Sequence, residues 1–179
     1  MARIFVEGNT FCLPDSEEYL IALELGKQLA SNNFTIVSNV RKGVTEAVFK
    51  GAYMTNENII RLAVDCAEIN LPRNTVFSKE IIADNFFDMK MRICVNSDGF
   101  VFLTGSFSVL SNIAIILQLK QLELMGNKPI ICVGDQWPEV LNTLSFYNEN
   151  SLKGFTENVI LVKSVDEAVN NLVNFFNKM

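Results

Sequence analysis

The sequence predicts an α/β protein with a single doubly wound, mostly parallel sheet covered by helices on both faces. Short apolar runs of strand length alternate along the chain with longer segments of helical periodicity, a pattern that favours right-handed βαβ units. The chain has 179 residues, 49% of them hydrophobic, which is enough to close one core. No linker, repeat or low-complexity stretch divides it, so residues 1–179 are expected to form one domain.

The predicted strands are short apolar runs. The run GFVFL is apolar throughout, as expected for a strand buried on both faces. Residues 65–86 are irregular, and we expect a loop there with a short extended piece around Ile81–Ala83. The remaining pattern predicts strands at Arg3–Glu7, Phe34–Val37, Ile59–Val64, Gly99–Leu103, Pro129–Val133 and Val159–Val162.

Helical segments separate these strands. Asp15 or Ser16 can cap the first helix, and Glu17 and Glu18 lie near its positive end. Gly126 is a stop signal for a long helix that begins after Ser106. The other helices are predicted after Gly43, from Phe87, at Glu139–Leu144 and at Val165–Phe176, and the long helix is expected to end near Met125.

The sequence contains no histidine. This absence excludes Ser-His-Asp and Cys-His catalytic arrangements, histidine metal ligands and histidine pH switches. Acid–base chemistry near pH 7 would fall to carboxylates, lysine, tyrosine or cysteine. We predict no metal ion and no cofactor.

The net charge of −5 argues against a nucleic-acid partner, because proteins that bind nucleic acid neutralise phosphates with clustered lysine and arginine. A small anionic ligand stays possible, since backbone amides and a few cations can hold one phosphate. No signal peptide or membrane-spanning run is visible, so we expect a soluble cytoplasmic protein. The cysteines form no CxxC pair and are expected to be buried free thiols: Cys12, Cys66, Cys94 and Cys132.

Ligands of doubly wound sheets bind outside the carboxyl ends of the strands, where the strand order switches. Three predicted turns therefore matter: Gly8–Thr10, Asn39–Gly43 and Thr104–Ser108.

Two of these turns resemble a known family. The segment GVTEAVFKGA, residues 43–52, is similar to the G-V-M-E-A-V-x-K-G-A stretch of the LOG-like Rossmann family. The segment from Asp98 to Ala114 resembles the strand, P-G-G-x-G-T-x-x-E loop and helix of that family, and Lys128-Pro129-Ile130 fits its next strand. The family includes cytokinin-activating phosphoribohydrolases, molybdenum cofactor carrier-type proteins and chains once labelled lysine decarboxylases. The resemblance implies a Rossmann-like fold, a nucleotide-like ligand and a homodimer or higher homo-oligomer.

The sequence departs from the family in both turns. Where the family loop reads P-G-G-x-G-T, this chain reads Thr104-Gly105-Ser106-Phe107-Ser108-Val109, with one glycine of three. Ser106 and Ser108 can partly replace the lost glycines by donating hydrogen bonds to a phosphate. The other glycine-rich turn of the family is replaced by residues 39–43, in which Arg41 and Lys42 can add charge near an anion.

The family's phosphoribohydrolases use a glutamate at the end of the loop motif and an arginine from an M-x-x-R-K segment. Here Met89-Lys90-Met91-Arg92 keeps the arginine, but Asn112 stands at the glutamate position. An amide neither carries negative charge nor accepts a proton at neutral pH, so we expect the active site to be degenerate. Glu46 is a candidate surrogate carboxylate.

Each of these residues also has a plain structural interpretation. Arg92 can pair with Asp88, four residues earlier on the same helix. Glu46 suits the first turn of any helix. Asn112 is either a ligand contact or an ordinary helix residue.

Three hypotheses follow. In the first, the protein binds a nucleotide or phosphorylated nucleoside without the family's hydrolase chemistry. In the second, it is an active nucleoside 5′-monophosphate phosphoribohydrolase that releases free base and ribose 5-phosphate. In the third, it is a structural homo-oligomer with a vestigial pocket, joined through Leu110–Met125. Arg92 and Glu46 are the candidate catalytic residues. The predicted ligand- or phosphate-binding set is Gly8, Asn9, Asn39, Arg41, Gly43, Thr104, Gly105, Ser106, Ser108 and Asn112.

Overall fold

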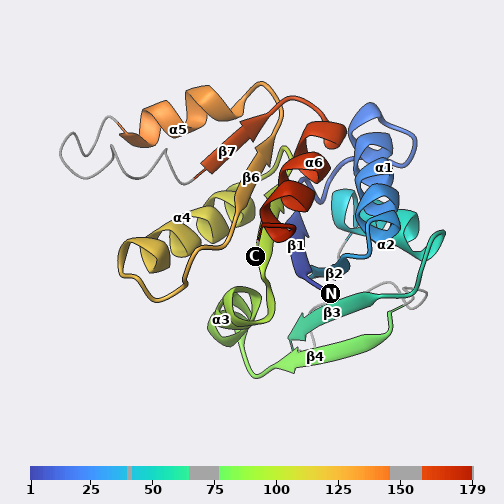
Figure 1. Cartoon of the computed structure of the whole chain (residues 1–179), viewed down its shortest axis with the longest axis horizontal. Helices are drawn as coiled ribbons and strands as arrows, with labels where there is room; N and C mark the ends of the chain where they lie inside the picture. The colour runs from blue at the N-terminus through green and yellow to red at the C-terminus, as the bar shows by residue number, and fades with distance from the viewer. Residues whose placement is uncertain (40–41, 65–76, 146–158, 179) are drawn as a thin grey trace.

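The computed structural model describes residues 1–39, 42–64, 77–145 and 159–178, and it confirms the predicted fold class. In these ranges seven strands form one sheet in the order β4-β3-β2-β1-β5-β6-β7, and every pair is parallel (Figure 1). The strands are β1 (Arg3–Glu7), β2 (Thr35–Ser38), β3 (Ile59–Val64), β4 (Lys79–Ala83), β5 (Gly99–Phe102), β6 (Ile130–Val133) and β7 (Val159–Val162).

The chain proceeds outward from β1 to β4 and then returns to β5, which lies on the other side of β1. The strand order therefore switches between β1 and β5. Every residue of β5 and β6 is buried, as the continuous apolar runs predict. The centre of the sheet, next to the switch in strand order, is therefore fully buried.

Helices cover both faces of the sheet, as expected for a doubly wound fold (Figure 1). On one face, Ile4 and Val6 pack with α1 (Glu17–Ser31), α2 (Val44–Tyr53) and α6 (Val165–Phe176). On the other face, Phe5 and Phe100 pack with the remaining three helices, α3 (Phe86–Asn96), α4 (Phe107–Gln121) and α5 (Trp137–Ser145). None of the helices in the described ranges is long and apolar enough to cross a membrane.

The long helix α4 ends earlier than the sequence predicts. It stops at Gln121 rather than near Met125, because Glu123 adopts a left-handed conformation with φ 58°. The Leu124 N–H then bonds to the Leu119 carbonyl oxygen at 2.9 Å and closes the helix end. The expected face Leu110–Met125 is therefore shorter by one turn.

Two other local predictions agree with the structure to within two residues. Ser16, one of the two predicted caps of α1, accepts a hydrogen bond from the Tyr19 N–H. The extended piece predicted around Ile81–Ala83 is the edge strand β4, which begins two residues earlier. Of the loop predicted over residues 65–86, residues 65–76 lie outside the described residues.

The helices α1 and α2 approach each other backbone to backbone. A Cβ atom on Gly26 would lie 2.0 Å from the Val48 carbonyl oxygen, and one on Gly51 would lie 1.9 Å from the Leu23 carbonyl oxygen. Backbone oxygens cannot move aside as flexible side chains do. The two glycines therefore allow α1 and α2 to pack closely against each other.

Replacing Gly51 with alanine is expected to lower the free energy of unfolding by about 2–4 kcal/mol, because the added methyl group forces α1 and α2 apart. This loss exceeds the gain in helix propensity of about 1 kcal/mol that alanine brings. Urea denaturation followed by circular dichroism measures it. Asn170→Ala, at an exposed position of α6, is the control and is expected to change stability by less than about 0.5 kcal/mol. An unchanged midpoint for Gly51→Ala would contradict the close approach.

Candidate functional site

The turns predicted to bind a ligand meet at one edge of the sheet. Residues 8–10 follow β1 and residues 104–106 follow β5, so the two turns flank the switch in strand order. The end of β2, with Asn39, lies beside them, and Val40 and Arg41 are outside the described residues. This edge is where ligands of doubly wound sheets bind.

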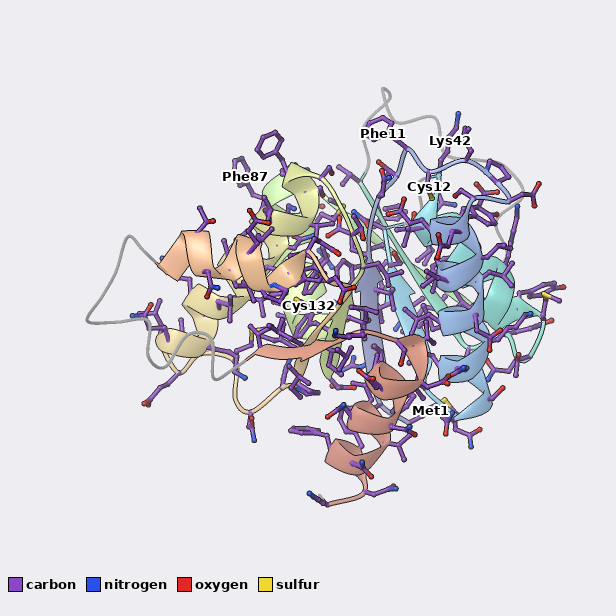
Figure 2. All side chains as sticks on the ribbon, turned by 90° about the horizontal axis from the view of Figure 1, so that it is seen from above. Met1, Phe11, Cys12, Lys42, Phe87 and Cys132 are labelled. Carbon is purple, nitrogen blue, oxygen red and sulfur yellow. The ribbon has the colours of Figure 1, made fainter. Side chains whose placement is uncertain are left out.

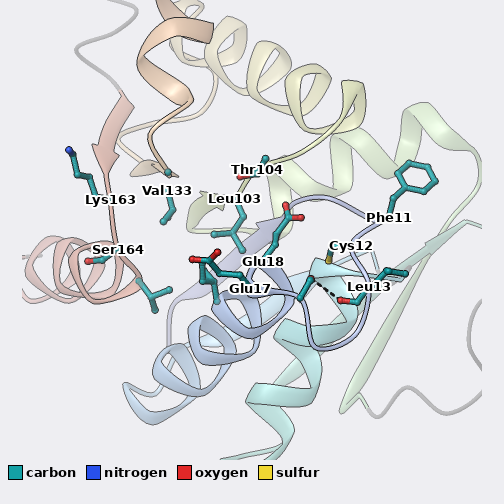
Figure 3. Close-up of a pocket in the computed structure, with 14 residues that line it drawn as sticks. Phe11, Cys12, Leu13, Glu17, Glu18, Leu103, Thr104, Val133, Lys163 and Ser164 are labelled. Carbon is teal, nitrogen blue, oxygen red and sulfur yellow. Dashed lines mark hydrogen bonds between the residues drawn. The ribbon is translucent and has the colours of Figure 1, made fainter.

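A cavity of about 860 Å³ opens at this edge (Figure 3). It lies between the start of α1 and the ends of β5, β6 and β7, and Ile21, Leu103 and Val133 contribute to its apolar wall. Its charged lining residues are Glu17, Glu18 and Lys163. Of the residues predicted to bind a ligand, Thr104 lines this cavity.

A hydrogen-bonded network of buried polar side chains lies beside the point where the strand order switches. Glu7, at the end of β1, is 1% exposed, Asn112 on α4 is 2% exposed, and Lys90 on α3 is 4% exposed. The Glu7 carboxylate accepts hydrogen bonds from the Ser108 hydroxyl at 2.8 Å and from the Asn112 amide nitrogen. Lys90 Nζ donates to Asn112 Oδ1 at 2.7 Å. This hydrogen-bonded network therefore links β1, α4 and α3.

The hydrogen-bond network gives Asn112 a structural role. The Asn112 amide donates to Glu7 and accepts from Lys90, so both of its polar atoms are used inside the protein. The carboxylate that Asn112 contacts lies on β1. Sequence reasoning did not single out Glu7 or Lys90. The available signal for Glu7 was a charged residue that directly follows the apolar run Ile4–Val6 of β1.

Both candidate catalytic residues form local ion pairs. Arg92 Nε lies 2.6 Å from Asp88 Oδ2, as the plain interpretation predicts, and this hydrogen bond lowers the pKa of Asp88. Glu46 Oε1 lies 2.7 Å from Lys50 Nζ. The hydrogen bonds from Lys50 to Glu46 and to Tyr19 raise the lysine pKa. Neither Arg92 nor Glu46 is among the residues that line the cavity.

The structure brings Gly8, Asn9 and Gly43 together. A Cβ atom on Gly8 would lie 2.6 Å from a methyl carbon of Val44, and Gly43 has φ 65°. The Val44 N–H donates to the Asn9 carbonyl oxygen at 2.9 Å, so the turn after β1 is joined to the start of α2. The Asn9 amide nitrogen donates to Glu18 Oε2 at 2.9 Å, which fixes a carboxylate of the cavity wall.

Asn39 contributes a buried acceptor at the end of β2. Its side chain is 4% exposed, and its Oδ1 atom has no hydrogen-bond partner among the residues that the structure describes. Among the predicted ligand-binding residues that the structure describes, Asn39 therefore combines a buried side chain with an acceptor atom that lacks a partner.

The first residues of α4 differ in exposure: Phe107 is 88% exposed, and Val109 is buried. A Cβ atom on Gly105 would lie 2.2 Å from Val109 Cγ2, so the one remaining glycine allows the loop to lie close over the first turn of α4. Neither Phe107 nor Val109 is among the residues that line the cavity. Ser106 is the N-cap residue, but its side chain makes no capping hydrogen bond.

Exposed aromatic side chains surround the same edge. Figure 2 shows Phe11, Lys42 and Phe87 along one side of the molecule, and Phe11 and Phe87 are 82% and 81% exposed. Phe11 also lines the cavity, from the turn after β1. Of these side chains, Phe11 contributes an exposed aromatic ring to the cavity.

The described cysteines are free thiols. Cys94 and Cys132 are buried, and burial raises the pKa of Cys132 to about 12. Cys12 is half-buried in the cavity wall, where burial and then the charge of Glu18 raise its pKa. A thiol with a raised pKa is a poor nucleophile near pH 7. Cys66 lies outside the described residues.

Glu7→Gln and Asn112→Asp are each expected to lower the free energy of unfolding by about 2–4 kcal/mol. The first change removes the carboxylate that balances Lys90, and the second places two carboxylates in contact. The double variant moves the carboxylate next to Lys90, so its loss is expected to be smaller than the sum by about 1–3 kcal/mol. A double-mutant cycle in urea measures the coupling, and strictly additive losses would contradict the buried hydrogen-bonded network.

The whole chain can be compared with known proteins. It matches no protein-family model and no curated protein. Among solved structures, the molybdenum cofactor carrier protein of Chlamydomonas reinhardtii is 20% identical, with 98% of each chain covered and a TM-score of 0.74. The molybdenum cofactor binding protein of the phototrophic bacterium Rippkaea orientalis is 17% identical over 97% of this chain and 95% of its own, with a TM-score of 0.66. DNA processing protein A of Helicobacter pylori is 16% identical over 97% of this chain and 80% of its own, with a TM-score of 0.62.

Molybdenum cofactor carrier-type proteins are among the members of the family that the sequence resembles. At 16–20% identity, the structural likeness shows the fold alone. The chain therefore has the Rossmann-like fold that the resemblance implies, shared with the molybdenum cofactor carrier protein of Chlamydomonas reinhardtii.

Proposed function

We propose that this protein binds a nucleotide or another nucleotide-like heterocycle at the carboxyl edge of its sheet, without hydrolysing it. The observation that carries the proposal is the cavity of about 860 Å³ beside the switch between β1 and β5. Cavities of this size, with an apolar wall and a few polar groups, hold ligands of about a nucleotide's size. Two structural neighbours are named for the molybdenum cofactor, which supports a ligand of this class.

The proposed lack of hydrolysis follows from the side chains at the family's catalytic positions. Asn112 uses both polar atoms within the protein, and Glu46 is held by Lys50. Cleavage of an N-glycosidic bond passes through an oxocarbenium-like state that needs a carboxylate facing the sugar. A binding role as a carrier or a sensor agrees better with this arrangement.

The expected association into a homodimer stays a prediction. The structure adds that Phe87, Met91 and Val95 are exposed at successive turns of α3, with exposures of 81%, 47% and 68%. We propose this face, together with α4, for contact between two copies of the chain.

Ile21→Trp is expected to abolish ligand binding, because Ile21 lines the cavity from α1 and is exposed enough to accept a larger ring without repacking the core. Leu20→Trp, on the next residue and outside the cavity lining, is the matched control. At a ligand concentration of about 100 Kd, the melting temperature of the wild type and of Leu20→Trp is expected to rise by about 5–10 °C. A panel of nucleosides, nucleotides and pterins that shifts no melting temperature would contradict the proposal.

The same panel tests the enzymatic alternative. We expect the purified protein to release no free base from nucleoside 5′-monophosphates, as measured by chromatography over hours. Turnover that persists through purification and disappears in Glu46→Gln would instead establish the hydrolase, with Glu46 as its carboxylate. Turnover that is equal in both proteins would indicate a contaminating enzyme.

A further inference from the structure

One carboxylate oxygen in the cavity wall lacks a hydrogen-bond partner. Glu18 lines the cavity from the first turn of α1, and its Oε2 atom accepts a hydrogen bond from the Asn9 amide nitrogen at 2.9 Å. Its Oε1 atom is shielded from solvent and has no partner among the residues that the structure describes. Shielded polar atoms are paired in the large majority of cases, so this free acceptor points to a donor that the cavity receives.

The turn after β1 holds the Glu18 carboxylate in place. The Phe11 N–H donates to Asn9 Oδ1 at 2.9 Å, so the Asn9 amide nitrogen is directed at Glu18 Oε2. An ionised carboxylate has about four sites that accept hydrogen bonds, and Asn9 uses one of them. The last torsion of a glutamate is broad, so a small turn of the carboxylate presents Oε1 to a ligand. Glu18 is therefore a positioned acceptor with most of its capacity unused.

Neighbouring polar groups of the cavity wall are committed elsewhere. Ser16 donates its hydroxyl hydrogen to the Leu13 carbonyl oxygen at 2.8 Å. Lys163 Nζ lies 3.6 Å from Asp135 Oδ1, and its side chain is 82% exposed. Figure 3 shows Lys163 on the opposite side of the cavity from Cys12 and Leu13. The donor that Glu18 lacks is therefore expected from a ligand.

The rest of the wall suits the flat face of a ring. Ile21, Leu103 and Val133 are apolar, and Phe11 adds an exposed aromatic ring. A carboxylate beside such apolar surface binds N–H donors strongly, because the bond is charge-assisted and little water competes for it. A planar heterocycle with N–H donors on one edge satisfies both the apolar wall and Glu18.

Heterocyclic bases differ in the donors along this edge. Guanine and the pterins share a 2-amino-4-oxo ring, in which a ring N–H and an amino group are adjacent donors that match the two oxygens of a carboxylate. Adenine presents an amino donor beside a ring-nitrogen acceptor, and that acceptor would face a carboxylate oxygen, which cannot donate. The guanine edge therefore fits Glu18, and the adenine edge does not.

We propose that Glu18 selects the ring of the ligand, and that this site takes heterocycles with a ring N–H beside an amino group, as in guanine and the pterins, in preference to adenine. The Glu18 carboxylate accepts both hydrogen bonds, and Asn9 keeps it oriented. The inference rests on the proposed function and deepens it by naming the class of heterocycle that binds.

Isothermal titration of the purified wild type with two matched pairs tests the proposal. Inosine is guanosine without its 2-amino group, and lumazine is pterin with an oxygen in place of that group. In at least one pair, the compound with the amino group is expected to bind about tenfold more tightly than its partner and than adenosine, because the analogue leaves a charged acceptor without a donor. The pair that shows the difference identifies the source, a nucleoside or a pterin.

Glu18→Gln keeps an oxygen for Asn9 and replaces the free acceptor with an amide donor. This variant is expected to lower the affinity for the amino compound about tenfold and to remove the difference within the pair. Glu24→Gln makes the same charge change on an exposed residue of α1 outside the cavity lining, and it is expected to keep the difference. Circular dichroism verifies that both variants fold, and the wild-type comparison does not depend on them.

The outcomes separate this inference from the proposed function. Tighter binding of adenosine, or equal binding within both pairs, would overturn the inference while supporting the proposed function. A difference that persists in folded Glu18→Gln would overturn the role of Glu18. Binding of no nucleoside, nucleotide or pterin would overturn the proposed function itself.

Discussion

A buried carboxylate at the end of the central strand links the elements that meet at the carboxyl edge of the sheet. Glu7 is almost completely removed from water, and an unpaired charge in that position would cost several kcal/mol. Its compensation comes from α4 through Ser108 and Asn112, and from α3 through Lys90. The positions of both helices are thereby linked to the end of β1, so the geometry of the switch point depends on this one chain of hydrogen bonds.

The other face of the sheet is held by a different constraint. There the close backbone approach at Gly26 and Gly51 fixes α1 against α2, and the contact between Gly43 and Asn9 fixes α2 against the turn after β1. The start of α1, with Glu17 and Glu18, is one wall of the cavity. Packing on one face and buried polar bonding on the other thus position the two sides of the site independently.

The sequence predicts what depends on local patterns and misses what depends on distant partners. Apolar runs predict β5 and β6 because burial on both faces leaves no polar position, and the ion pair of Arg92 with Asp88 follows from a spacing of four residues. Glu7 and Asn112 are 105 residues apart, and no spacing rule relates them. The end of α4 was misplaced because Gly126 is a stronger stop signal than Glu123, which nevertheless adopts the left-handed conformation.

The motif resemblance does not reveal which partners Asn112 has in the folded protein. Considered alone, Asn112 marks a lost carboxylate and hence a lost activity. Considered with Glu7 and Lys90, it is part of a buried hydrogen-bond network whose carboxylate comes from β1. The Glu7 carboxylate is 1% exposed and is not among the residues that line the cavity, so it is not available there to a sugar ring. These contacts of Asn112 and Glu7 therefore support the proposal that the protein binds its ligand without hydrolysing it.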